Sequence, residues 1–201
     1  MKKVEEIVLD EEAPEVASMH PQKFAMWLFI VTVIMLFAGF TSAYIVRKAE
    51  GNWLDYELPM SFWVTTLIIV ISSATMQWAY ISAKKDNLLN LKISISLTSL
   101  LGFLFLVGQW AAWSELVSSQ VYFAGNFSNP AGSFLYVFTG LHAMHLIGGI
   151  VFLSIMLFFA LKEQIHSQNL VKMEMCTTYW HFLGGLWLYL YGFLLYNHWV
   201  L

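Results

Sequence analysis

The sequence predicts an all-α membrane protein, a bundle of five transmembrane helices. Of its 201 residues, 59% are hydrophobic and 11% are charged, whereas soluble domains carry about 25% charged residues. Asp, Glu, Lys and Arg are absent from five stretches, each longer than the roughly 20 residues that a helix needs to cross the hydrocarbon core of a bilayer. These stretches lack the alternation over about 10 residues that barrel strands show, and backbone groups in lipid are otherwise satisfied only within helices.

The predicted spans follow one another in the chain, near residues 24–46, 60–82, 92–114, 134–160 and 177–199. The fourth uncharged stretch is longer than one span, but it begins with "VSSQVYFAGNFSNPAG", whose Ser, Asn, Gly and Pro indicate a loop. We therefore predict an acidic N-terminal tail, residues 1–23, followed by a five-helix transmembrane domain, residues 24–201. The tail is not a signal peptide, because acidic residues stand where a signal needs an apolar core.

Basic residues predict how the bundle is oriented. With five spans, eight of them share the side of the N-terminus: Lys2, Lys3, Lys23, Lys84, Lys85, Lys92, Lys162 and Lys172. Only Arg47 and Lys48 fall on the opposite side. Because loops on the cytoplasmic side carry an excess of Lys and Arg, we expect the N-terminus to be cytoplasmic and the C-terminus to lie outside.

No Asp, Glu, Lys or Arg lies in the middle of any predicted span. Ion-coupled transporters and proton pumps usually need such residues, and the chain has no visible inverted repeat, so a transporter is disfavoured. The nearest acidic residue is Glu115, at the outer end of the third span, where Gln109 lies on a related face; a charge at a helix end is ordinary. The single Cys176 excludes an internal disulfide and a cysteine-based metal cluster.

Three histidines lie inside predicted spans and raise the question of a cofactor. His142 and His145 are three residues apart in the fourth span, and His181 is in the fifth. A haem held by two histidines needs ligands that face each other at one depth, usually from different helices. Helical rise places His145 and His181 roughly 7 Å apart in depth, which is poor geometry for a haem. We therefore favour hydrogen bonds between helices or to lipid head groups, while an independent haem-binding cytochrome remains an alternative.

The other histidines, His20, His166 and His198, are expected at the surface. The fifth span differs from the others in its many large rings, among them Trp180 and Trp187. Rings on all sides of a helix imply contacts on most sides. This composition favours a subunit that is docked inside a larger assembly over a bundle that stands alone.

Several segments resemble subunit III of the haem–copper cytochrome c oxidases. "FLYVFTGLHAMHLIGGIVFL" (134–153) is similar to a helix whose signature in that family is an aromatic-rich T-G-x-H-x-x-H-x-x-x-G. "YWHFLGGLWLYLYGFLLY" (179–196) resembles the family's last helix, with its Y-W-H-F and W-L-x-L-Y pattern. "LFIVTVIMLFAGFTSAY" (28–44) resembles its third helix, and Gln109 with Glu115 fits the end of its fifth. The resemblance extends over residues 20–201 and is to the short five-helix bacterial form.

Two positions depart from the family pattern. Many members carry a buried Glu in the third helix where this chain has Val33, and a further acid is expected where it has Ala112. Any role in proton transfer attached to that Glu therefore cannot be carried over to this chain.

The resemblance implies the subunit of a proton-pumping terminal oxidase that itself binds neither haem nor copper. Such a subunit packs on the catalytic subunit I beside subunit II, holds phospholipid, and supports proton uptake and stability during turnover. No catalytic or metal-binding residue and no nucleic-acid partner are then expected on this chain, and haem and copper belong to partner subunits. The implied location is the bacterial cytoplasmic (inner) membrane. Whether the electron donor is cytochrome c or a quinol, and whether the oxidase joins a respiratory supercomplex, stays open.

The candidate residues for contacts between helices or with lipid combine the polar groups and large rings of these motifs: Gln109, Glu115, Thr139, His142, His145, Trp180, His181 and Trp187.

Overall fold

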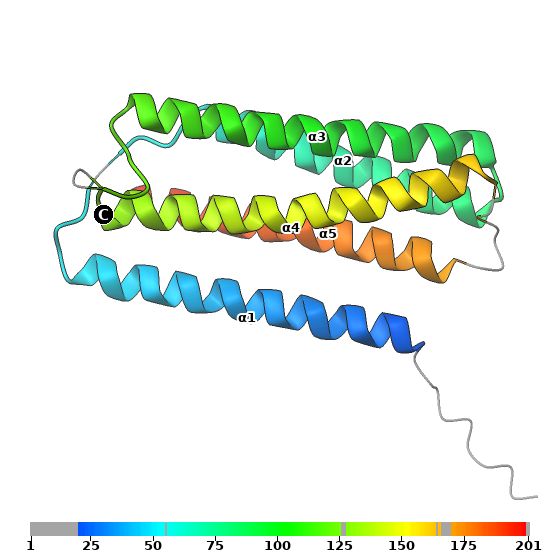
Figure 1. Cartoon of the computed structure of the whole chain (residues 1–201), viewed down its shortest axis with the longest axis horizontal. Helices are drawn as coiled ribbons and strands as arrows, with labels where there is room; N and C mark the ends of the chain where they lie inside the picture. Colours follow the sequence, from blue (N-terminus) through cyan, green and yellow to red (C-terminus); the bar gives the residue numbers. More distant parts are fainter. Residues whose placement is uncertain (1–19, 55, 126–127, 164, 166–169, 200–201) are drawn as a thin grey trace, which may run out of the picture.

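The computed structural model describes residues 20–54, 56–125, 128–163, 165 and 170–199, together with the side chains in that range up to residue 197. These residues form five α-helices and no strand (Figure 1). In chain order the helices are α1 (Pro21–Ala49), α2 (Ser61–Lys84), α3 (Leu88–Ser118), α4 (Pro130–Leu161) and α5 (Val171–Trp199). The predicted all-α fold class is confirmed.

The helix ends follow local capping chemistry. α1 begins at Pro21, since proline is pre-organised for the first turn of a helix, and the His20 imidazole accepts a hydrogen bond from the backbone N–H of Gln22. The span predicted near residues 24–46 lies within this longer helix. α4 likewise begins at Pro130, after Asn129 caps the backbone N–H of Ala131.

The helices form three layers. In Figure 1, α2 and α3 lie along the top, α4 and α5 lie in the middle, and α1 lies along the lower edge. α1 contacts α4 and α5, whereas the described residues show no backbone approach between α1 and either α2 or α3. The pair α4–α5 is thus the centre of the bundle, and α5 contacts α1, α2 and α4.

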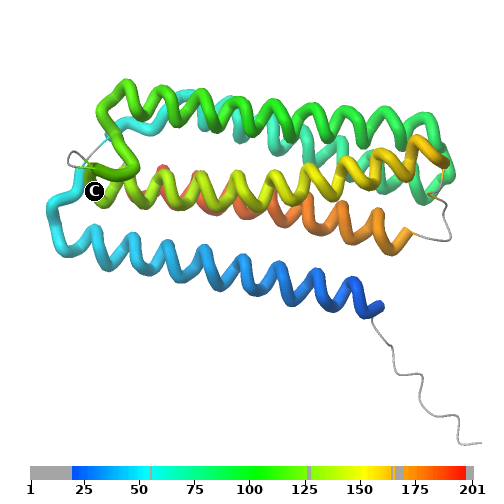
Figure 2. The backbone as a smooth tube through the Cα atoms, viewed as in Figure 1, coloured from blue at the N-terminus to red at the C-terminus, as the bar shows by residue number. Residues whose placement is uncertain are grey.

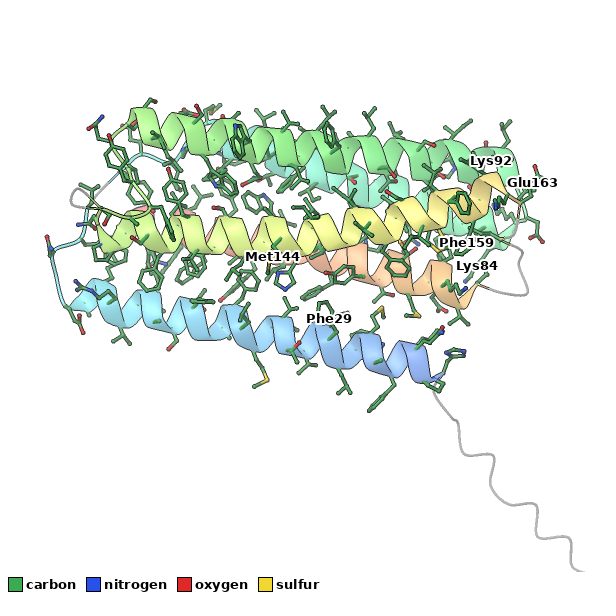
Figure 3. All side chains as sticks on the ribbon, in the orientation of Figure 1. Phe29, Lys84, Lys92, Met144, Phe159 and Glu163 are labelled. Carbon is green, nitrogen blue, oxygen red and sulfur yellow. The ribbon has the colours of Figure 1, made fainter. Side chains whose placement is uncertain are left out.

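The smooth trace of Figure 2 shows which connections share an end of the bundle. The start of α1, the α2–α3 turn, the end of α4 and the start of α5 lie at one end, and the end of α1, the end of α3, the starts of α2 and α4 and the end of α5 lie at the other. Ion pairs join helices at the first end: Lys23 to Glu174 at 2.5 Å, and Lys92 to Glu163 at 2.9 Å. Figure 3 shows Lys92 and Glu163 side by side there.

Four of the five helices, α1 to α4, are long and apolar enough to cross a membrane. α5 has 29 residues, as many as α1, but its Tyr, Trp and His side chains lower its mean hydropathy. Trp180 and Trp187 are nevertheless fully buried. α5 therefore places these two indole rings against other helices, as expected of a helix at the centre of the bundle.

Close packing around Trp180 depends on two glycines. A Cβ atom added at Gly102 of α3 would lie 2.6 Å from Cη2 of Trp180, and one added at Gly149 of α4 would lie 2.8 Å from Cδ1 of Leu183. The indole is rigid and enclosed by three helices, so it cannot move aside without disturbing them.

We predict that Gly102→Ala destabilises the protein by about 1–3 kcal/mol, because the added methyl group overpacks the core against Trp180. Gly148→Ala is the matched control, since nothing lies within 4 Å of a Cβ atom there. Thermal unfolding of the full chain in a mild detergent measures the difference. Equal melting temperatures for the two variants would contradict the packing described above.

Tyr56 lies in the α1–α2 connection, in a small pocket shared with Tyr44, Trp53 and Leu194. Burial raises the pKa of its phenol above the ordinary value of 10.0, and the neighbouring Tyr44 raises it further. The folded state thus favours the neutral phenol, so this contribution to stability is fully present below pH 10 and is lost as the pH rises above it.

We predict that Tyr56→Phe removes the tyrosine that ionises at a higher pH than an ordinary phenol. The absorbance of tyrosinate is measured for both proteins during an alkaline titration. The difference curve is the wild-type absorbance minus that of the variant, plotted against pH. The difference curve should rise only above pH 10; a rise centred at or below that pH would show a solvated phenol.

Candidate functional site

His142 lies in α4 at the centre of the bundle and is fully buried. Its ring is in contact with Phe105 of α3, with ring centroids 5.8 Å apart, and with Trp187 of α5 at 5.2 Å. Neither ring nitrogen has a hydrogen-bond partner among the described residues. The surroundings of His142 are thus aromatic, and its contacts with α3 and α5 are packing contacts.

His145, one turn further along α4, faces α1. Its imidazole donates from Nδ1 to the carbonyl oxygen of Leu141 in its own helix, at 2.7 Å. The ring packs against Phe29 and Phe37 of α1, with centroid distances of 6.2 Å and 6.0 Å. Figure 3 labels Phe29 on the side of α1 that faces α4 and α5. The Tyr179 hydroxyl of α5 donates to the backbone carbonyl of His145 at 3.2 Å, so this turn of α4 holds α1 and α5 together.

His181 of α5 is half-buried and bonds to α2 through both ring nitrogens. Nε2 lies 3.1 Å from Oε1 of Gln77, and Nδ1 lies 2.5 Å from the hydroxyl of Ser73. A carbonyl oxygen can only accept, so Nε2 donates to Gln77 and Nδ1 accepts from Ser73. His181 is therefore a polar link between two helices inside the membrane-spanning part of the bundle.

The three histidines face three different sets of neighbours: α3 and Trp187, α1, and α2. No two of them oppose each other across a shared space. Among the residues that the structure describes, no group of three or more His, Cys, Asp or Glu side chains is placed to hold a metal ion. His20 is exposed at the start of α1, whereas His166 and the side chain of His198 lie outside the described part.

Gln109 and Glu115 of α3 both bond to α2. The buried Gln109 amide donates to the Thr65 hydroxyl at 3.3 Å, and its Oε1 has no partner among the described residues. One Glu115 carboxylate oxygen accepts from the Ser61 hydroxyl at 2.9 Å. Ser61 and Thr65 are four residues apart and so share a face of α2.

The two tryptophans of α5 also bond to α2. The Trp180 indole N–H donates to the Ser72 hydroxyl at 3.0 Å, and the Trp187 indole N–H donates to the Thr66 hydroxyl at 2.9 Å. Thr139 plays a matching part between α3 and α4, since its hydroxyl accepts from the Trp113 indole at 3.0 Å and donates to the Leu135 carbonyl.

The hydrogen-bond partners on α2 are the functional residues that sequence reasoning missed: Ser61, Thr65, Thr66, Ser72, Ser73 and Gln77. Their spacing of four and seven residues was a signal that could have found them, because side chains at those intervals lie on one side of a helix. Ser and Thr in transmembrane helices commonly bond across to a neighbour. These partners lie on α2, whereas the family motifs lie in the segments 28–44, 134–153 and 179–196.

Val33 and Ala112, which stand where acids were expected from the family pattern, are both buried. Neither side chain can bind or release a proton. The interior of the bundle at these two positions is therefore apolar.

The cytochrome c oxidase subunit III family model matches residues 54–200 of this chain. The chain belongs to this family. It is 28% identical over 172 residues to cytochrome c oxidase subunit 3 of Corynebacterium diphtheriae, a match that covers 82% of each chain. The same subunit of Coturnix japonica is 30% identical over 186 residues, which cover 84% of this chain and 67% of that one. Nocardia farcinica has a probable subunit 3 that is 28% identical over 171 residues.

The resemblance that the motifs indicated is thus confirmed. A subunit III chain is a multi-pass membrane protein of a respiratory oxidase complex, and the apolar helices α1 to α4 agree with that location. The matched segment includes the helices that carry all eight candidate residues, α3, α4 and α5.

We predict that His181→Phe destabilises the chain by about 1–2 kcal/mol, because the ring is kept while Ser73 and Gln77 lose their partner. His145→Phe is the control, since the bond of that imidazole stays within α4. Unfolding in detergent by increasing denaturant measures both variants. In a double-mutant cycle, His181→Phe and Gln77→Leu should be less than additive; full additivity would mean that the two residues do not interact.

Proposed function

We propose that this chain is subunit III of a proton-pumping cytochrome c oxidase of a bacterial cytoplasmic membrane, and that it serves as a scaffold without a redox centre. In this role it packs on subunit I, beside subunit II, and supports proton uptake and stability during turnover. Haem and copper belong to the partner subunits. The observation that carries the proposal, beyond family membership, is how the intramembrane polar groups are used.

Those polar groups are arranged for packing. The indoles of Trp180 and Trp187 and the imidazole of His181 bond to α2, and His145 bonds within its own helix. Such bonds fix helices to one another. A relay of protons would need groups that change protonation state along a continuous path, and Val33 and Ala112 supply none at the two positions where the family pattern led us to expect acids.

We also propose that the bundle binds phospholipid and that its lysine-rich end is cytoplasmic. Lysine ammonium groups at that end lie over aromatic rings: Lys84 over Tyr80 at 4.7 Å, Lys162 over Phe158 at 4.4 Å and Lys172 over Phe159 at 5.1 Å. Lysine beside an aromatic ring suits the zone where phosphate groups meet the hydrocarbon core. An excess of basic residues at this end agrees with the cytoplasmic side.

We predict that the chain purified alone shows no haem absorption in the Soret region, and that the oxidase containing His142→Leu, His145→Leu or His181→Leu keeps its full haem and copper content. The physical reason is that these histidines face different helices and cannot act as a pair of axial ligands. Optical spectra and metal analysis of the purified complex measure both quantities. A Soret band from the chain alone, or a stoichiometric loss of haem, would refute the scaffold role.

Co-purification tests whether this chain is a subunit of an oxidase complex. A tag on this chain should recover a subunit I with haem and copper, and a subunit II with a dinuclear copper centre. Recovery of an oxidase without that copper centre would assign the chain to a quinol oxidase. Recovery of the chain by itself would remove the proposed function.

A further inference from the structure

One side of α5 is left uncovered by the residues that the structure describes. α5 is flanked by α2 and α1 and backed by α4, and the described residues of α1 and α2 do not approach each other. On the fourth side, residues at helical spacing form a stripe: His181, Gly185, Leu188 and Gly192. His181 is half-buried and the other three are exposed. A Cβ atom added at Gly185 or Gly192 would meet nothing within 4 Å.

The stripe lies between two hollows. One, of about 370 Å³, lies between α2 and α5 and includes Ser73, Gln77 and His181 in its lining. The other, of about 450 Å³, lies between α1 and α5 and is lined by apolar groups such as Ile34 and Phe182. Gly185 lines both. The hollows and the stripe thus form one groove, which we call the α5 groove, with α5 as its floor and α1 and α2 as its walls.

The polar groups of this groove indicate what covers it. Gln77 accepts from His181 through Oε1, and no described residue accepts from its amide nitrogen. Gln77 lies seven residues before the end of α2, about 10 Å from that end at the rise of an α-helix. Acyl chains at this depth offer no hydrogen-bond acceptor, whereas another helix offers hydroxyl and carbonyl oxygens.

The composition of the floor points the same way. α5 is less apolar than the other four helices, and its exposed residues include Tyr189 and Tyr196. Glycines on such a face let a second backbone approach closely, which is the main source of packing energy between helices in lipid. A protein helix satisfies both the glycine floor and the amide of Gln77, and a lipid chain satisfies only the first.

We propose that the α5 groove docks a transmembrane helix of another oxidase subunit, which presents a hydroxyl or backbone carbonyl oxygen to the amide of Gln77. This inference rests on the proposed function, because it names the face through which the subunit is held in the complex. Gly185 sets the distance of closest approach, and Gln77 sets the depth at which the partner helix sits.

The test uses the native oxidase, purified through a tag on a different subunit, and measures the amount of this chain per haem. Gly185→Leu fills the floor of the groove, and Gln77→Leu removes the amide. Each should lower the retained chain about ten-fold, the effect of losing one close contact or one intramembrane hydrogen bond. Gly148→Leu on α4 is the matched control, since it fills equally open space on another helix and should leave retention unchanged. Immunoblots of the membranes before extraction show that each variant is made and inserted.

A cross-linking arm identifies the occupant. Gly185→Cys, labelled with a short photoreactive reagent, should couple this chain to a transmembrane segment of another subunit, and Gly148→Cys should not; the native Cys176 is buried and is present in both. Coupling only to lipid, coupling to a second copy of this chain, or wild-type retention of Gly185→Leu and Gln77→Leu would overturn the docking proposal while leaving the proposed function standing. If the wild-type chain does not purify with the tagged oxidase at all, the proposed function fails and this inference fails with it.

Discussion

The constraint on which the structure depends is that hydrocarbon supplies no hydrogen-bond partners. A polar group that enters the membrane-spanning part forms a hydrogen bond only where protein supplies the partner. A row of polar side chains on α2 supplies such partners: it accepts the indole hydrogens of Trp180 and Trp187 and bonds to the imidazole of His181. The buried His142 imidazole, by contrast, has no partner among the described residues. The same row bonds to Gln109 and Glu115 of α3. α2 is thus the helix that fixes α3 and α5 in register.

The central place of α5 follows from this arrangement. A helix so rich in Tyr and Trp is a poor match for lipid on all sides, but each indole and imidazole has one apolar face and one polar edge. When the edges bond to α2, the face of Trp187 packs against Phe105 and His142. Glycines at 102 and 149 make room for Trp180. α1 then adds to this core through Phe29, Phe37 and the ion pair at Lys23. The side of α5 that none of these helices covers is the side that we assign to a partner.

The sequence allowed the fold to be predicted well, because charge-free runs longer than a bilayer is thick leave few alternatives. The site was harder to predict. His142, His145 and His181 looked alike in the sequence, as single polar residues in apolar spans, yet one packs among rings, one bonds within its own helix, and one bonds across to α2. The partner of a histidine depends on how its helix is rotated relative to neighbouring helices that are distant in the chain. Hydropathy does not predict that rotation. The hydroxyl groups of α2 were visible in the sequence at helical spacing, but their importance appears only when the indoles of α5 are placed opposite them.

The sequence by itself determined the number of helices, their approximate ends and, through the motifs around residues 139–149 and 179–189, the family. It could do so because each span must by itself be apolar and long enough to cross the bilayer, and because a family motif is a short continuous segment. Only the tertiary structure decided that α5 lies at the centre, that α2 carries the acceptors, that Trp180 needs the open space of Gly102, and that α1 and α2 leave Gly185 uncovered between them. Each of these is a relation between helices that approach from different parts of the chain, so its energy depends on distances that no single span specifies.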